Sequence, residues 1–164
     1  MDMPYFRKLM VQNLKGSVVE FSIGTGLNFP YYPYTAITSL LGIDQSPGML
    51  ELAKKRIEQV VPSHAKPNIT LLEANVHTLN PLDEHSLIPA NNFDNVVQTF
   101  GMCSQADPVQ TLDTMIQVCK PGGTVYLIEH GKPAPRLRMV YSKSHLLAQV
   151  GTVWPFIPDR LAKF

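Results

Sequence analysis

Short apolar runs alternate with amphipathic helical segments along the first 130 residues, and this alternation constrains the fold more than any other feature of the sequence. The runs, which we predict to be β-strands, cover residues 17–23, 39–44, 68–74, 93–100 and 124–130. They are nearly continuous in apolar side chains, as is typical of parallel strands buried on both faces. Because crossovers between parallel strands are right-handed, the pattern predicts an α/β fold with a doubly wound parallel sheet.

Two of the predicted helices begin with the same signal. Ser46-Pro47 and Asp107-Pro108 each place a capping side chain before a proline, which suits the first helical turn. We expect the first of these helices to end near Val61, before Pro62, and the second to end at the turn 121–123. The stripe that we expect the first helix to bury consists of Met49, Leu52, Ala53, Ile57 and Val60.

The composition excludes several classes of protein. The chain has 164 residues, 45% of them hydrophobic, which is the size of one domain and too apolar for a disordered chain. No run approaches the ~20 apolar residues that a bilayer span needs, and no secretory signal is visible, so we expect neither segment. Two cysteines exclude a disulfide scaffold and favour an intracellular location, and no paired Cys or His spacing predicts a metal site.

Polar and glycine residues gather where the predicted strands end. Residues 20–26 contain a carboxylate and a glycine turn, Asp44 ends the second strand, Asn75 follows the third, and Thr99 and Phe100 end the fourth. Ligands of open parallel sheets bind at the carboxyl ends of the strands. Glycine allows close approach to the backbone, a carboxylate can accept both hydroxyls of a ribose, and an amide can recognise an adenine edge.

Taken singly, these features have plainer explanations. The glycine turn is compatible with an ordinary strand-to-helix turn, and Asp44 with a helix cap. Their order at successive strand ends instead favours a nucleoside ligand. Dinucleotide enzymes need a third small residue in G-x-G-x-x-G, and here Phe29 occupies that place, which counts against NAD or FAD.

The same strand ends resemble those of class I S-adenosylmethionine-dependent methyltransferases, in particular the type-11 branch. The matching stretches are VVEFSIGTG, LLGIDQSPGMLELAKKR, LLEANVHTL, FDNVVQTFGMCS and CKPGGTVYLIEHG, within residues 5–131. Within that branch, GTGLNFPYYP and LIEHG are similar to membrane-associated eukaryotic methyltransferase-like proteins, including mitochondrial ones and thiol methyltransferases. They are also similar to phospholipid amine methyltransferases and, more distantly, quinone-ring C-methyltransferases.

The resemblance implies S-adenosylmethionine as the cofactor and assigns it a set of contacts. Glu20, Gly24 and Gly26 would surround the methionine moiety. Asn28 would help to fix the methionine carboxylate, and Asp44 would hold the ribose hydroxyls. The contacts implied near the adenine and the methyl group are Gln45, Met49, Asn75, Val76, Thr99 and Phe100. Ser22 replaces the family's first glycine and Asn75 its usual aspartate. No catalytic residue is certain; His130 is either a base near the acceptor or simply the end of a strand.

Residues 131–164 differ from the rest of the chain. The first 130 residues carry eight Lys and Arg against twelve Asp and Glu, a net charge of −4, which argues against nucleic acid as a partner. The last 34 carry six basic residues against one acidic residue, a net charge of +5. We predict a helix over 137–149 and a sheet truncated to five strands, without the family's C-terminal β-hairpin. Residues 136–164 either contact a membrane surface or protein partner, or cover the bare sheet edge.

These observations predict a single domain over 1–164, with a methyltransferase core at 5–131 and a basic, aromatic tail at 132–164. The predicted function is methyl transfer by in-line displacement to a small or lipid-like acceptor. The alternative is a non-catalytic, cofactor-binding partner protein or truncated isoform. The expected location is mitochondrial or cytoplasmic, with membrane association.

Overall fold

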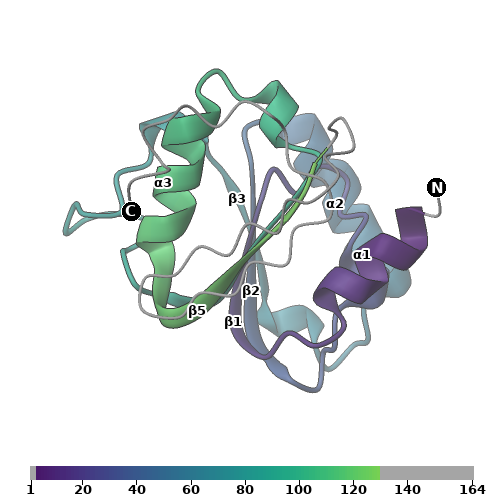
Figure 1. The fold of residues 1–164 in the computed structure, drawn as a ribbon. Coiled ribbons are helices and arrows are strands. Elements are labelled where there is room, and N and C mark those ends of the chain that lie inside the picture. Colours follow the sequence, from purple (N-terminus) through teal and green to yellow (C-terminus); the bar gives the residue numbers. More distant parts are fainter. Residues whose placement is uncertain (1–2, 130–164) are drawn as a thin grey trace, which may run out of the picture.

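The protein is built on one parallel sheet (Figure 1). The structure is a computed structural model that describes residues 3–129. Its strands are β1 (Gly16–Phe21), β2 (Ile37–Asp44), β3 (Ile69–Glu73), β4 (Phe93–Thr99) and β5 (Cys119–Ile128). They lie in the order β3-β2-β1-β4-β5, and all neighbouring pairs are parallel. This order confirms the predicted doubly wound fold. His130, the predicted helix 137–149 and the tail lie outside the described residues.

Within residues 3–129, three helices and four short 3₁₀ turns accompany the strands; the first helix precedes β1, and the others lie between strands. The helices are α1 (Met3–Val11), α2 (Pro47–Val60) and α3 (Pro108–Val118), and the 3₁₀ turns are η1 (Phe29–Tyr31), η2 (Lys66–Asn68), η3 (Val76–Thr78) and η4 (Met102–Ser104). Figure 1 shows α1 and α2 on one side of the sheet and α3 on the other. Both predicted caps are confirmed, since Ser46 accepts a hydrogen bond from the Met49 amide and Asp107 accepts from two amides of α3.

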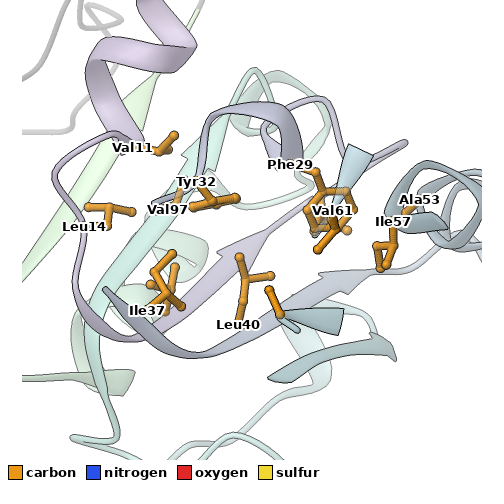
Figure 2. Close-up of a cluster of buried hydrophobic side chains, with 13 residues drawn as sticks. Val11, Leu14, Phe29, Tyr32, Ile37, Leu40, Ala53, Ile57, Val61 and Val97 are labelled. Atoms are coloured by element: carbon orange, nitrogen blue, oxygen red, sulfur yellow. The ribbon is translucent and has the colours of Figure 1, made fainter. Parts of the chain in front are cut away.

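Separate hydrophobic clusters cover the two faces of the sheet. On the α1 and α2 side, Figure 2 shows Val11, Leu40, Ala53 and Ile57 among the packed side chains. The cluster on the other face includes Met115 and Val118 from α3. Burial on both faces explains why the strands are continuous apolar runs rather than alternating ones.

The buried stripe predicted for α2 is wrong at three of its five positions. Ala53 and Ile57 are buried, but Met49, Leu52 and Val60 are 44%, 49% and 38% exposed. The helix therefore contacts the core on this face mainly through Ala53 and Ile57, with the partly buried Leu50 packed against it. Met49, one turn before Ala53, instead lies at the carboxyl edge of the sheet.

The fifth strand begins earlier than predicted. Cys119 already pairs with Phe93, and the register then shifts so that Thr124 pairs with Asn95. The predicted turn 121–123 is therefore an irregularity inside β5. Gly123 is needed there because an added Cβ would lie 2.8 Å from the Asp94 carbonyl oxygen and the Cys119 sulfur. Within residues 3–129, no helix is long and apolar enough to cross a membrane.

Candidate functional site

A cleft of about 360 Å³ opens at the carboxyl end of the sheet, where the sequence places its polar strand ends. Its walls come from the ends of β1 and β2 and from the segments that follow β3 and β4. The lining residues are Phe21, Ser22, Gly24, Ile43, Asp44, Gln45, Ser46, Met49, Ala74, Val76, Phe100, Gly101, Ser104 and Gln105. Gly24, Asp44, Gln45, Met49, Val76 and Phe100 are the predicted site residues among them.

Asp44 holds two segments of the cleft wall together. One carboxylate oxygen accepts a hydrogen bond from the Gly24 amide at 2.8 Å, and the other accepts from the Ser46 amide at 3.0 Å. A carboxylate has about four acceptor positions, so two remain for ligand hydroxyls after these bonds are made. Asp44 therefore both shapes the cleft and can bind a diol within it.

The loop after β1 turns sharply into the cleft. Ser22, Gly24 and Gly26 have φ angles of 51°, 55° and 72°, in the left-handed region that favours glycine. Ser22, at the place of the family's first glycine, adopts this conformation nonetheless, and its hydroxyl oxygen accepts a hydrogen bond from Gln105 at 2.9 Å. A Cβ added to Gly24 would meet no protein atom within 4 Å, so the space beside Gly24 is open to a ligand.

The segment after β4 forms the opposite wall. Phe100 has a φ of 56°, which is unusual for a bulky residue and directs the chain sharply after the strand. A Cβ on Gly101 would lie 2.7 Å from the Cβ of Ser22, so glycine lets the two loops touch. A Glu129 carboxylate oxygen accepts from the amides of Gly101 and Met102 at 3.0 and 3.1 Å and anchors this wall to the end of β5.

Three other predicted residues, Glu20, Asn28 and Thr99, lie outside the cleft lining. Together with Arg7 and Tyr32 they form what we call the buried polar network. The Asn28 amide donates to Glu20 at 2.7 Å and to Thr99 at 3.2 Å, and the Tyr32 hydroxyl donates to Glu20 at 2.7 Å. Arg7 donates to Asn28 and to Thr99, each at 2.9 Å. The structure thus brings Glu20, Asn28 and Thr99 together, on the α1 side of the sheet.

Burial dominates the charge properties of this network. It raises the pKa of Glu20 from 4.5 to about 7, although hydrogen bonds from Tyr32 and Asn28 and the charge of Arg7 act in the opposite direction. Burial and the neighbouring carboxylate also raise the pKa of Tyr32. Burial lowers the pKa of Arg7. The network therefore holds ionisable groups in a poorly solvated place, where burial disfavours their charged forms.

Gly26 and Asn75 also lie outside the lining. The Asn75 side chain is exposed and accepts from the His77 amide at 2.9 Å, which caps η3 and places Val76 at the cleft. An added Cβ on Gly26 would collide with the ring of Phe29, which packs under the loop. Phe29, which counted against a dinucleotide site, is thus a core residue of this turn.

Sequence reasoning missed the contribution of Gln105, Ser104 and Arg7. Ser104 lies in a stretch that matched the family, but no motif marked the other two residues. Gln105 bonds to Ser22 and Arg7 to Thr99, over 83 and 92 positions of chain. The described residues contain no group of three or more His, Cys, Asp or Glu placed to hold a metal ion.

The cleft has the features that S-adenosylmethionine requires. Its volume is within the usual range for small-ligand sites, and a carboxylate and an open glycine lie in its wall. Apolar side chains at Met49, Val76 and Phe100 provide contact area for a base. The residues present therefore fit this cofactor.

Comparisons with known proteins agree with the geometry. A family model described as "Methyltransferase domain" matches residues 19–127. The mitochondrial methyltransferase OMS1 of Saccharomyces cerevisiae is 31% identical over 133 residues, covering 77% of this chain and 28% of that protein. A phosphatidylethanolamine N-methyltransferase of Cereibacter sphaeroides is 30% identical, covering 70% of this chain and 51% of that protein. The chain thus spans about half or less of the length of these relatives.

Solved structures agree on the fold. A methyltransferase structure from Bacillus halodurans superposes with a TM-score of 0.65 at 15% identity, covering 81% of this chain and 53% of the other. One from Methanococcus maripaludis gives 0.62 at 18% identity, covering 77% and 54%. The chain therefore belongs to the methyltransferase-domain family, the type-11 branch of class I methyltransferases, whose cofactor is S-adenosylmethionine.

Proposed function

We propose that the cleft binds S-adenosylmethionine and that the protein transfers a methyl group from it to a small or lipid-like acceptor. The observation that carries the proposal is the position of Asp44 in an open cleft at the carboxyl ends of β1 and β2, facing the glycine loop. The cofactor supplies an activated methyl group. The protein needs mainly to bind and align the two reactants.

Each wall has a part in this proposal. Asp44 accepts hydrogen bonds from the ribose hydroxyls, and Met49 and Val76 pack against the adenine, with Gln45 beside it. Asn75 positions Val76 by capping η3. The open backbone at Gly24 faces the methionine moiety. Phe100 and the residues after it exclude water on the side where an acceptor would approach.

The acceptor class rests on the relatives. One relative is named as a phosphatidylethanolamine N-methyltransferase, and one from Shouchella clausii, 32% identical, as a demethylmenaquinone methyltransferase. A lipid amine and a quinone ring carbon are therefore the first acceptors to test. The similarity to a mitochondrial yeast protein supports a mitochondrial location. Imaging of the tagged chain beside a mitochondrial marker tests that location.

Calorimetric titration with S-adenosylmethionine tests the binding site. We expect the Asp44→Asn variant to bind about 1–3 kcal/mol more weakly, a loss of roughly five- to 150-fold, because hydrogen bonds to a charged acceptor are lost. Asp113→Asn, an exposed change on α3, is the matched control and should leave the affinity unchanged. An unchanged affinity of the Asp44 variant contradicts the ribose assignment.

A transfer assay separates the enzyme from its alternative. Isotope-labelled methyl donor is incubated with the protein and with phosphatidylethanolamine, demethylmenaquinol or a small thiol, and label in the extracted product is counted. Transfer to one class identifies the acceptor. Binding without transfer to any of them supports the non-catalytic, cofactor-binding protein instead.

A further inference from the structure

Ser22 adopts a backbone conformation that suits glycine better than serine. It follows β1 at the place of the family's first glycine, and its φ of 51° lies in the left-handed region. A residue with a Cβ is disfavoured there because the Cβ comes too close to the following carbonyl oxygen, whereas glycine enters this region freely. Other contacts must therefore hold Ser22 in this conformation.

The Ser22 side chain is held from the segment after β4. Its hydroxyl oxygen accepts a hydrogen bond from Nε2 of Gln105 at 2.9 Å, and the same nitrogen lies 3.4 Å from the Gly101 carbonyl oxygen. Gln98 also donates to the hydroxyl oxygen, but at 3.5 Å, which is the outer limit of a hydrogen bond. Gln105 is thus the main partner of Ser22.

Gly101 makes room for this pair of side chains. An added Cβ at position 101 would lie 2.7 Å from the Cβ of Ser22 and 2.9 Å from its hydroxyl oxygen. The Gly101 amide donates to Glu129 at 3.0 Å, which fixes the segment to the end of β5. The partner that Ser22 meets is therefore itself held in place.

The loop that begins at Ser22 is also attached to β2, since the Gly24 amide donates to Asp44 at 2.8 Å. The loop thus has two supports, Asp44 on one side and Gln105 on the other. If the bond to Gln105 is lost, Ser22 can leave the left-handed region, and Gly24, two residues later, moves with it. Gly24 is the residue beside which the cleft is open to a ligand.

We propose that Ser22 and Gln105 are positioning residues for the cofactor, and that their hydrogen bond maintains here the loop conformation that a glycine would adopt unaided. The inference rests on the proposed function, since it takes S-adenosylmethionine to lie against Gly24. It predicts that the contribution of Gln105 to cofactor binding depends on which residue occupies position 22.

One substitution in two backgrounds tests this dependence. Gln105→Met, which removes the donor and keeps most of the side-chain length, is made in the wild-type chain and in Ser22→Gly. In calorimetric titration with S-adenosylmethionine, we expect it to weaken binding about three- to tenfold in the wild-type chain, as for one lost hydrogen bond. In Ser22→Gly the same change should alter the affinity by less than about twofold, because glycine needs no support. Gln59→Met, an exposed change on α2, is the control and should have no effect in either background.

Hydrogen exchange of the loop amides, at residues 22–26, tests the positioning without a ligand. Gln105→Met should raise their exchange rate in the wild-type chain, because the loop then opens more often. The increase should be smaller in Ser22→Gly. A role of Gln105 in overall stability alone would instead raise the exchange rate alike in both backgrounds.

The outcomes are distinct. Equal weakening of cofactor binding in both backgrounds overturns the inference and indicates that Gln105 contacts the ligand or supports the fold by itself. No weakening in either background also overturns it. If the wild-type chain does not bind S-adenosylmethionine, the proposed function fails, and hydrogen exchange decides the positioning role: loop exchange that Gln105→Met leaves unchanged overturns it.

A second variant covers the case in which Gln105→Met does not fold. Ser22→Ala keeps the Cβ but lacks the hydroxyl, so it has neither the hydrogen bond nor the freedom of glycine. It should bind S-adenosylmethionine about three- to tenfold more weakly than Ser22→Gly does. Equal affinities of these two variants overturn the inference.

Discussion

The cleft and the buried polar network lie at the same end of one sheet, yet their polar groups are held in different ways. In the cleft, Asp44 is bound by backbone amides and keeps acceptor positions open to solvent. In the network, Glu20 and Asn28 are 1% and 0% exposed. They bond to each other and to the side chains of Arg7, Tyr32 and Thr99. One site is open toward a ligand, whereas the other is closed by the fold itself.

This difference predicts different consequences of mutation. A cleft residue can be changed at small cost in stability, because water replaces its lost partner. A network residue cannot, because its removal leaves buried donors and acceptors unpaired. Ligand affinity and the free energy of unfolding should therefore respond separately in the two regions.

Asn28→Ala should give the largest effect. The change removes hydrogen bonds to Glu20, Arg7 and Thr99, and it leaves Oε1 of the buried Glu20 without a partner, while Arg7 and Thr99 keep the bond to each other. We expect the free energy of unfolding to fall by about 2–4 kcal/mol in urea titrations. Asn92→Ala, at an exposed position, is the control and should change it by less than about 0.5 kcal/mol. A small loss at Asn28 would contradict the view that the network is closed by the fold.

Glu20 should make stability depend on pH. Its pKa is raised to about 7 in the folded chain from 4.5, so the stability that its neutral form contributes is complete below pH 4.5 and is lost as the pH rises through 7. Relative to Glu20→Gln, the wild type should lose about 1–3 kcal/mol of unfolding free energy between pH 4.5 and 8. Urea unfolding of both proteins across that pH range measures the difference in their unfolding free energies. Groups that both proteins share, such as Asp94, titrate alike in the two and cancel in this difference. A constant difference would show that Glu20 stays charged.

The fold was predictable because its signals are local. The caps at Ser46 and Asp107 and the apolar strand runs act over a few residues, and the structure contains the helices and strands that they indicate. The buried stripe of α2 was not predictable in detail. It depends on how closely the helix approaches the sheet, which periodicity alone does not specify.

The site was predictable in outline for a similar reason, because strand ends meet at one edge of a parallel sheet. What sequence could not decide is the face to which each residue points. Glu20 and Phe21 are neighbours on β1, but only Phe21 lines the cleft, while Glu20 points to the α1 side. The part played by Arg7 depends on its hydrogen bond to Thr99 at the end of β4, a contact between distant parts of the chain.

Gly24→Ala tests the comparison at a cleft residue, and we expect it to have the smallest effect on stability. A left-handed φ costs a residue with a Cβ about 1–2 kcal/mol, and no clash with protein atoms adds to it. The new methyl group would instead occupy space that a ligand needs, so we expect the affinity for S-adenosylmethionine to fall at least tenfold, about 1.4 kcal/mol. Gly48→Ala in α2, where φ is not left-handed, is the control and should stabilise the helix slightly without changing affinity. If Gly24→Ala lost stability but bound the cofactor normally, the glycine would serve the fold alone, and the open space beside it would not be the binding surface.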